Sequence, residues 1–312
     1  MDLRVPPIAF GGSALGDMPD TYGYSVDDER ARQTIRAILA LPDGFIDTSR
    51  NYGMGRSEER IGQVVRELGG WPEGRILSTK LDRDMETGRF DAAQARRSLE
   101  ESLKALGVTR VQILHLHDPE HGANLSEVKR KGGALSELVK MKEEGLAVAI
   151  GLAAGKIDVM IPILRDWDLD VLITHNRFTL VNRNAEPMIA LAQVRGMAVL
   201  NAAPFAGGVL AKGTADYRRY VYQQASEKML APIARVEAIC ARHGVPPGAA
   251  ALQFSLRDPR IASTICGVSR PERVEETLAW VKWPIADEVW KELLALPFSA
   301  EDPEMMRDYK PG

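Results

Sequence analysis

Short apolar runs alternate with amphipathic stretches along the whole chain, and this alternation limits the possible folds more than any other feature of the sequence. The apolar runs have the length and composition of β-strands and fall at residues 7–10, 44–47, 75–80, 111–117, 147–151, 171–174, 198–202 and 262–266. The other stretches have helical periodicity, at residues 27–41, 57–68, 91–106, 134–144, 156–164, 185–195, 231–243 and 271–281. Such strict alternation predicts parallel strands joined by right-handed helical crossovers.

Eight units of this kind predict an α/β fold in which the strands close into a single (β/α)8 TIM barrel. The alternative, an open doubly wound sheet, carries a Gly-x-Gly-x-x-Gly turn after a strand. The nearest match starts at Gly53 and Gly55 but has Glu58 at the last position, so we interpret it as a coincidence. No Pro/Ser-rich linker, repeat or low-complexity segment interrupts the sequence. We therefore expect one domain over residues 1–312, with a polar surface tail from about residue 297.

The composition argues against several classes of function. A net charge of −3 and a pI near 6.0 give no reason to propose nucleic acid or an anionic membrane as the partner, so we expect a small-molecule ligand. No apolar run approaches the roughly 18 residues that span a bilayer, and the first residues lack the pattern of a secretion signal, so we expect a cytoplasmic protein. Cys240 and Cys266 have no metal-ligand spacing and form no disulfide framework. The choice between monomer and homo-oligomer stays open.

Four polar residues lie at or just beyond the ends of three successive strand-like runs: Asp47, Tyr52, Lys80 and His117. Because a parallel sheet carries its chemistry at the carboxyl ends of its strands, we expect them to share one pocket. A buried Lys80 needs a counter-ion, which Asp47 can supply. If the Lys80 cation lies within hydrogen-bonding range of Tyr52, it lowers the pKa of that phenol below its usual value of roughly 10. Tyr52 can then exchange a proton with a carbonyl or alkoxide oxygen that His117 orients.

None of these four side chains is a good hydride donor or nucleophile in this setting, so the arrangement predicts a redox cofactor, and nicotinamide is the natural candidate. Taken singly, each residue also has a structural explanation as part of an ion pair, a loop or the core. His115 lies two residues before His117, and we interpret it as a hydrogen-bonded core histidine. No third ligand at a suitable spacing accompanies the two histidines, so we expect no metal.

A second candidate site runs over residues 265–276, from the last strand-like run into the following helix. Ser269 with Glu272 predicts a capping box at the start of that helix. Arg270 and Arg273 then lie at the positive end of the helix dipole, which is mildly unfavourable for cations unless an anion is bound. A cofactor phosphate would explain them, and the alternative is that the arginines extend into solvent.

The longest irregular connection spans residues 207–229. Long loops in a compact barrel are often lids or binding loops. A short solvated helix with its tyrosines packed down would explain the same composition, so both interpretations stay open. The aromatic and cationic residues in its middle are Tyr217, Arg218, Arg219, Tyr220 and Tyr222.

Several motifs together resemble those of the aldo-keto reductases, and the resemblance covers the chain from end to end. Asp47, Tyr52, Lys80 and His117 fall on the catalytic tetrad of that family, in which Tyr52 would be the general acid/base. The resemblance implies a barrel that binds NAD or NADP in an extended form. The matching segments are Phe45-Ile-Asp-Thr-Ser, Asn51-Tyr-Gly, Gly55-Arg-Ser-Glu-Glu-Arg-Ile-Gly, Leu77-Ser-Thr-Lys, Leu114-His-Leu-His-Asp-Pro and Pro271-Glu-Arg-Val-Glu-Glu.

The resemblance also implies positions for the cofactor. Residues 203–210 look like the loop that covers it after the seventh strand. Gly267 occupies a place where NADPH-preferring members usually carry a lysine for the 2′-phosphate, which favours NAD over NADP. Ala153 and His175 stand near places where many members hold the nicotinamide amide with Ser and Gln. The implied cofactor residues are Ala153, His175, Asn176, Pro204, Phe205, Ala206, Gly208, Leu210, Gly267, Ser269, Arg273 and Glu276.

Within the family, the opening Phe10-Gly-Gly-Ser-Ala-Leu-Gly and the segment Leu116-His-Asp-Pro-Glu resemble the aldose 1-dehydrogenase branch. This branch, which includes L-fucose and D-threo-aldose dehydrogenases, oxidises a sugar hemiacetal to a lactone. The polar mix at the strand-end loops fits a hydroxylated substrate. The candidate substrate-binding residues are Asp17, Tyr22, Asn51, Asp118 and His121.

Four other functions remain open from the sequence. An NADPH-dependent aldehyde reductase or a pyridoxal dehydrogenase would carry the same tetrad. A lyase would form a Schiff base at Lys80, but a neighbouring Asp47 raises the pKa of the lysine and so disfavours this reading. A regulatory subunit would bind the cofactor without rapid turnover.

Overall fold

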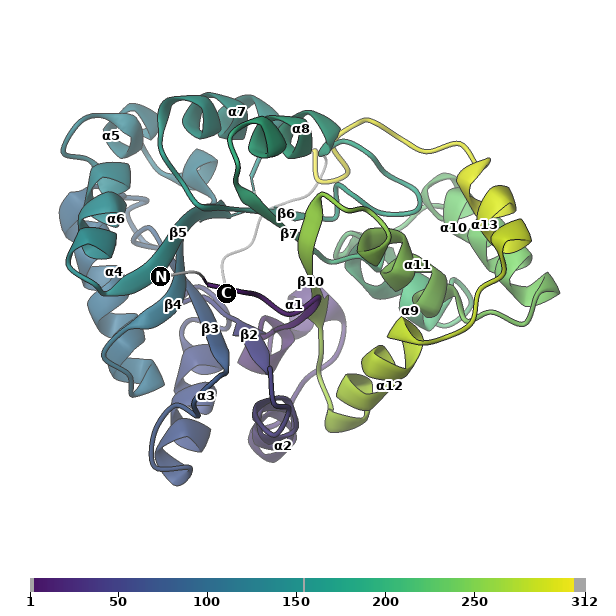
Figure 1. Cartoon of the computed structure of the whole chain (residues 1–312), viewed down its shortest axis with the longest axis horizontal. Coiled ribbons are helices and arrows are strands. Elements are labelled where there is room, and N and C mark those ends of the chain that lie inside the picture. Colours follow the sequence, from purple (N-terminus) through teal and green to yellow (C-terminus); the bar gives the residue numbers. More distant parts are fainter. Residues whose placement is uncertain (1–2, 154, 306–312) are drawn as a thin grey trace.

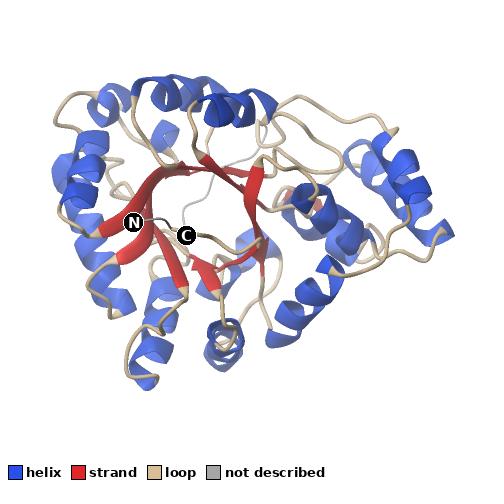
Figure 2. Ribbon diagram, viewed as in Figure 1, coloured by secondary structure: helices blue, strands red, loops and turns tan. Residues whose placement is uncertain are grey.

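The computed structural model describes residues 3–153 and 155–305, which form a closed barrel of eight parallel strands surrounded by helices (Figures 1 and 2). The strand order around the barrel is β1-β10-β7-β6-β5-β4-β3-β2. The predicted (β/α)8 fold is therefore confirmed, and each predicted strand run matches a barrel strand to within two residues at either end. The barrel strands are β1 (Ile8–Gly11), β2 (Phe45–Asp47), β3 (Ile76–Leu81), β4 (Val111–His117), β5 (Ala147–Ala153), β6 (Val171–His175), β7 (Ala198–Ala202) and β10 (Ile261–Gly267).

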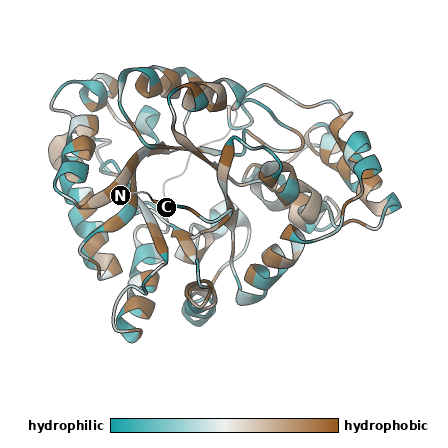
Figure 3. Ribbon diagram, in the orientation of Figure 1, coloured by the Kyte–Doolittle hydropathy of each residue, from teal (hydrophilic) through white to brown (hydrophobic). Residues whose placement is uncertain are grey.

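The helices around the barrel are amphipathic, with hydrophobic and hydrophilic residues on different sides (Figure 3). Seven of the eight predicted helices lie in this layer. None of the described helices has the length and apolar composition that a membrane crossing requires. The helices that cover the barrel are α2 (Asp28–Leu39), α3 (Arg56–Glu67), α4 (Ala92–Leu106), α6 (Ala134–Glu143), α7 (Ile157–Asp166), α8 (Glu186–Val194), α11 (Pro247–Leu256) and α12 (Pro271–Val281).

The eighth predicted helix, at residues 231–243, is α10 (Glu227–Arg242), and it lies outside the barrel layer beside α13 (Asp287–Leu294) (Figure 1). The helix that covers β10 is instead α11, which the sequence prediction missed. Its residues from Gly248 to Leu252 are all buried, because α11 packs between β10, α12, α9 (Val209–Lys212) and α10. A helix that is apolar on every side lacks the periodicity from which helices are predicted.

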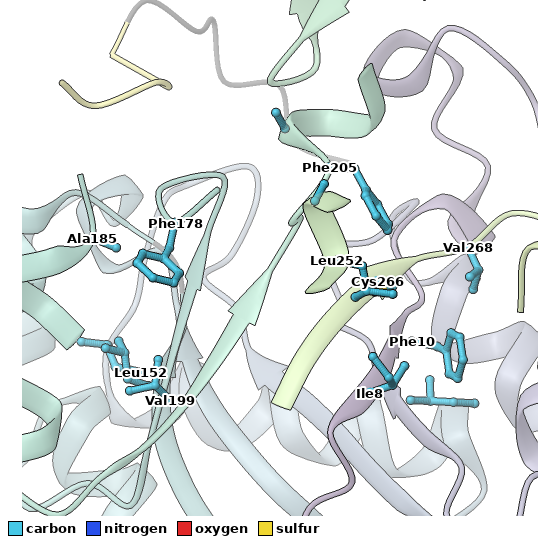
Figure 4. Close-up of a cluster of buried hydrophobic side chains, with 14 of the residues drawn as sticks. Ile8, Phe10, Leu152, Phe178, Ala185, Val199, Phe205, Leu252, Cys266 and Val268 are labelled. Atoms are coloured by element: carbon cyan, nitrogen blue, oxygen red, sulfur yellow. The ribbon is translucent and has the colours of Figure 1, made fainter. Parts of the chain in front are cut away.

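Two apolar layers hold the barrel together. One lies between the strands and the helices, where Ile8 and Phe10 of β1 lie near Cys266 of β10 (Figure 4). The other layer fills the inside of the barrel and includes Ala9, which lies between Ile8 and Phe10 in β1. Side chains of a strand alternate between its two faces, so one short strand contributes to both layers.

Short elements occupy the connections at the carboxyl ends of the strands. The connection at residues 207–229 contains α9 and a two-stranded hairpin, β8 (Arg219–Tyr220) and β9 (Gln223–Gln224). Arg219 donates hydrogen bonds to the backbone carbonyls of Asp20 and Thr21 in α1 (Pro19–Tyr22). The hairpin is thus attached to the connection that follows β1. The other short elements are η1 (Ala14–Gly16), η2 (Pro119–His121), α5 (Leu125–Lys129) and η3 (Ala206–Gly208).

The residues from 299 to 305, called here the C-terminal segment, are largely exposed but attached to the connection after β6. The backbone N–H of Arg183 donates to the carbonyl of Ser299 at 2.8 Å. Arg177 forms an ion pair with Asp302 at 3.0 Å, and Glu304 is only 12% exposed. The predicted surface tail is therefore fastened to the barrel as far as residue 305, and residues 306–312 lie outside the described part of the chain.

Candidate active site

The four residues predicted to share a pocket meet at the carboxyl ends of β2, β3 and β4. The Lys80 ammonium donates to Asp47 Oδ2 at 2.7 Å and to the carbonyl of Thr48 at 2.6 Å. It lies 4.8 Å from the centre of the Tyr52 ring, and the rings of Tyr52 and His117 meet edge to face with centroids 5.9 Å apart. All four line one cavity of about 140 Å³, called here the first cavity.

Glycines allow the connection that carries Tyr52 to lie close to the connection after β1. A Cβ on Gly53 would lie 2.0 Å from the carbonyl oxygen of Gly16, and Gly53 also has a positive φ of 62°. Ser57 Oγ donates to the carbonyl of Gly12 at 2.8 Å and so joins the same two connections. A side chain at Gly16 or Gly53 would force these two connections apart.

The pKa of Tyr52 is raised well above its usual value, first by burial and then by the negative charges of Asp47, Asp118 and Asp82. Lys80 directs its ammonium at Asp47 and a backbone carbonyl instead of at the phenol oxygen. The prediction that Lys80 lowers the pKa of Tyr52 is therefore wrong for this arrangement. The phenol stays protonated at neutral pH and can donate a proton or a hydrogen bond.

Asp82 is a buried carboxylate in the site that the sequence prediction missed. Its Oδ1 lies 2.6 Å from His117 Nδ1, and its Oδ2 accepts hydrogen bonds from Ser49 Oγ at 2.5 Å and from the backbone N–H of Asn51 at 2.9 Å. Burial lowers the pKa of His117, but the charges of Asp118 and Asp82 outweigh it and raise that pKa overall. The sequence held a signal, since Asp82 comes two residues after Lys80 and so faces the same side.

His115 is buried below the site, as predicted, but it is hydrogen-bonded on one side only. Its Nδ1 lies 3.3 Å from Ser78 Oγ, whereas its Nε2 has no hydrogen-bond partner among the described residues. Burial, followed by the charge of Lys80, lowers the pKa of His115 well below its usual value, so the ring is neutral. The described residues contain no group of three or more His, Cys, Asp or Glu side chains placed to hold a metal ion.

A second cavity of about 690 Å³ adjoins the first and shares Tyr22, Ala203, Tyr222 and Gly267 with it. The second cavity is cationic. Burial, followed by the charges of Arg273, Arg270 and Arg219, lowers the pKa of Lys212 to about 8. Cations gathered around a cavity are favourable when an anion such as a phosphate binds there. The cationic residues of its lining are Arg30, Lys212, Arg270 and Arg273.

Most of the residues implied for the cofactor line these cavities. Ala153 and His175 line the first cavity, and Gly267 lines both. Those that line the second cavity alone are Phe205, Gly208, Ser269, Arg273 and Glu276.

Four residues implied for the cofactor line neither cavity: Asn176, Pro204, Ala206 and Leu210. The side chains of Ala206 and Leu210 are fully buried in the apolar layer behind the cavity wall. Asn176 donates from its amide to Glu304 of the C-terminal segment at 3.1 Å. Sequence reasoning overlooked Tyr24 and Arg30, because they lie far in the sequence from residues 203–210 and 265–276, and it also overlooked Lys212, which lies just beyond the first of these segments.

The capping box predicted at α12 is also wrong. Arg270 is the N-cap residue, and no side chain accepts a capping hydrogen bond there. The helix begins at Pro271, one residue later than a cap at Ser269 would require, and the Ser269 side chain bonds to Tyr24 instead. Ser269 thus belongs to the lining of the second cavity and does not stabilise the helix end.

Among the predicted substrate residues, Tyr22, Asn51 and Asp118 line the first cavity, and His121 lies in an adjacent small cavity that shares Asp118. Asp17 lines neither of these cavities. Its carboxylate accepts the backbone N–H of Val26 at 3.0 Å, so it organises the connection after β1. The prediction of Asp17 as a substrate contact is therefore not supported by its position.

The Aldo/keto reductase family profile matches residues 7–296, and the chain therefore belongs to that family of NAD(P)-dependent oxidoreductases. Among curated proteins it is similar to the D-threo-aldose 1-dehydrogenase of Pseudomonas sp, with 28% identity covering 93% of this chain and 94% of that protein. It is also similar to the pyridoxal 4-dehydrogenase of Microbacterium luteolum (28% identity, covering 89% and 82%) and to the L-galactose dehydrogenase of Arabidopsis thaliana (29%, covering 89% and 85%).

A solved structure with a similar fold is an aldo-keto reductase from Bacillus halodurans in its holo form. The TM-score is 0.76 at 20% identity, and the match covers 98% of this chain and 97% of that one. A glycerol dehydrogenase from Gluconobacter oxydans gives a TM-score of 0.70 at 21% identity, covering 94% and 91%. These likenesses support the fold.

Proposed function

We propose that the protein oxidises an aldose of the L-fucose or D-threo-aldose class at C1 to the lactone, using NAD(P). The observation that carries the proposal is the lining of the first cavity, where the polar side chains of Asn51 and Asp118 stand beside Tyr52 and His117. Side chains of this kind bind hydroxyl groups, whereas an apolar lining would favour a hydrocarbon substrate. Two of the similar proteins, a D-threo-aldose 1-dehydrogenase and an L-galactose dehydrogenase, carry names of sugar enzymes.

Each residue of the tetrad has a role in this proposal. Tyr52 Oη is the general acid/base: its phenolate accepts the proton of the hydroxyl that is oxidised, so the raised pKa of Tyr52 should make oxidation faster at higher pH, and His117 Nε2 orients the reacting oxygen. Lys80 and Asp47, paired at 2.7 Å, hold the floor of the cavity and its charge in place. The nicotinamide, when bound, supplies the hydride acceptor. The Lys80 ammonium, which donates to both Asp47 and Thr48, is not arranged as the free amine that a Schiff-base lyase requires.

We infer that the dinucleotide would occupy the two joined cavities. Its nicotinamide end would lie near Ala153 and His175, and its phosphates near Lys212, Arg270 and Arg273. We propose NAD as the preferred form, because Gly267 places no cation where many NADP-dependent relatives have one. If NADP is preferred, Lys212 and Arg270 are the cations available for its 2′-phosphate.

Pyridoxal is a second candidate substrate. Tyr22, Tyr222 and Met18 add apolar surface to the first cavity, which suits an aromatic ring. One of the similar proteins is named a pyridoxal 4-dehydrogenase.

Initial rates of NAD⁺ and NADP⁺ reduction, measured separately with L-fucose, D-arabinose, L-galactose, L-xylose and pyridoxal, test the proposal. Activity with a sugar supports it, activity with pyridoxal alone selects the second candidate, and silence together with NADPH-dependent reduction of simple aldehydes refutes both. Tyr52→Phe should lower kcat by about 10²-fold or more and leave nucleotide binding intact. The matched control is Tyr220→Phe, since Tyr220 lines neither cavity.

A further inference from the structure

Three consecutive side chains at the end of β6 converge on one carboxylate of the C-terminal segment. Glu304 Oε1 lies 2.5 Å from His175 Nε2 and accepts a hydrogen bond from the Asn176 amide at 3.1 Å. Arg177 Nη1 lies 3.7 Å from the same oxygen. Consecutive side chains of an extended strand point to opposite faces, so a regular strand could not bring these groups together. Asn176 has a positive φ of 58°, a backbone conformation that asparagine adopts more readily than most residues, and this breaks the alternation.

The hydrogen bonds of His175 determine which part of its ring faces the first cavity. A carboxylate only accepts hydrogen bonds, so Nε2 carries a hydrogen and donates it to Glu304. A guanidinium only donates, so Nδ1, which lies 3.4 Å from Arg177 Nη1, is the acceptor. Both nitrogens are therefore engaged by residues that do not line the first cavity. The ring face and the carbon edge are left for that cavity.

His175 stands in the wall between two cavities. It lines the first cavity, and together with Arg177 and Glu304 it lines the small cavity of about 100 Å³ beside it. The side chain of His175 is 19% exposed and that of Glu304 is 12% exposed, so the pair is largely shielded from solvent. Arg177 is held in turn by Asp302 at 3.0 Å. The C-terminal segment thus supports this wall from the side opposite to the first cavity.

We propose that Glu304 is a positioning residue for the nicotinamide end of the bound nucleotide. It holds His175 so that the imidazole presents its face and carbon edge to the nicotinamide, and no hydrogen-bonding nitrogen. The proposal rests on the nucleotide placement proposed above, in which the nicotinamide lies near Ala153 and His175. Two flat rings gain most from packing when the orientation of the protein ring is fixed beforehand, because ordering it on binding would cost conformational entropy.

Calorimetric titration with two ligands separates this role from a general effect on the fold. NAD⁺ carries the nicotinamide and ADP-ribose lacks it, while both have the adenosine and the phosphates. Glu304→Ala should weaken NAD⁺ binding about 10-fold and leave ADP-ribose binding unchanged. Glu304→Gln keeps an oxygen that accepts from His175 and Asn176, so its affinity for NAD⁺ should stay within about 3-fold of the wild type. If NADP⁺ is the tighter ligand, it is compared with 2′-phospho-ADP-ribose in the same way.

Glu301→Ala is the matched control. Glu301 lies on the same segment with an exposed side chain, and its backbone carbonyl, which the substitution keeps, accepts a hydrogen bond from Asn182. This variant should bind both ligands as the wild type does. An equal loss of affinity for NAD⁺ and ADP-ribose in Glu304→Ala, or no loss for NAD⁺, would overturn the proposal.

NMR of the histidine side chains, with ¹⁵N labelling, tests the geometry in the full chain without nucleotide or substrate. The sequence has five histidines, and His175→Gln identifies the signals of His175 by their loss. The Nε2–H proton of His175 should exchange with water slowly enough to be observed in the wild type and in Glu304→Gln, and it should disappear in Glu304→Ala. Absence of this signal from the wild type, or its persistence in Glu304→Ala, would refute the hydrogen bond that the proposal requires. If the wild type oxidises no sugar or pyridoxal, the proposed substrates fail, while the binding and NMR results still decide the role of Glu304.

Discussion

Replacing Lys80 with methionine removes the cation from a buried ion pair while it keeps a side chain of similar length. Lys80 is 2% exposed and Asp47 is 4% exposed. Two groups lose a partner: the Asp47 carboxylate loses its counter-ion at 2.7 Å, and the Thr48 carbonyl loses its donor at 2.6 Å. Breaking a buried pair from one side costs about 3–5 kcal/mol. Because Ser78 Oγ still donates to Asp47 Oδ1 at 2.8 Å, we expect a loss of about 4 kcal/mol and not the maximum.

Urea unfolding of Lys80→Met, followed by tryptophan fluorescence, measures this loss. Asp47→Asn and the double variant complete the cycle. In the double variant no charge is left without a partner, so its unfolding free energy should exceed the additive value by about 2 kcal/mol. If Lys80→Met unfolds within about 1 kcal/mol of the wild type, the Asp47 carboxylate is not held as a buried charge and the reasoning is refuted.

Three further predictions address packing, the C-terminal segment and pH. Gly62→Ala should lower the free energy of unfolding, measured by thermal unfolding, by about 1–3 kcal/mol, because the new Cβ would lie 1.9 Å from a backbone carbonyl oxygen of α4. The control is Gly267→Ala, in which the Cβ enters open space, so this variant should keep the wild-type Tm. Arg177→Met should release the C-terminal segment, so limited proteolysis should cut there faster than in the wild type and leave the barrel intact. The raised pKa of His117 gives stability that is complete below about pH 6.5 and is lost as the pH rises through the folded-state value; urea unfolding across that range should show this decline in the wild type and a smaller one in Asp82→Asn.

The elements that could be predicted from the sequence are those that their own residues specify, without contributions from distant parts of the chain. All eight barrel strands carry their own apolar runs, and the strand ends placed Asp47, Lys80 and His117 together. Helix α11 was missed because neighbours on several sides make it apolar all around, which only the tertiary structure shows. The raised pKa of Tyr52 could not be predicted from the sequence either. This pKa depends on which oxygen atoms accept hydrogen bonds from the Lys80 ammonium, and several acceptors lie within its range.

The residues around the tetrad could be predicted from the sequence more completely than those of the second cavity. Asp82 lies at a spacing that sequence reasoning can use, two residues beyond Lys80, and it was overlooked only because β3 had been expected to end at Lys80. The cations of the second cavity are a different case. Arg30 and Lys212 come from α2 and α9, far apart in the sequence, and no local pattern shows that they line the same cavity.

The catalytic tetrad and the cations of the second cavity come from different sides of the barrel. The tetrad lies on β2, β3 and β4 or just after them, whereas most of the cations lie on α9 or at the start of α12. The two cavities share four lining residues, and the connection after β1 contributes to both of them. Directed evolution toward a new sugar can thus randomise the connections after β2 and β4 while the lining of the second cavity stays constant. A change of nucleotide can be sought in α9 and α12 without disturbing the proton-handling half.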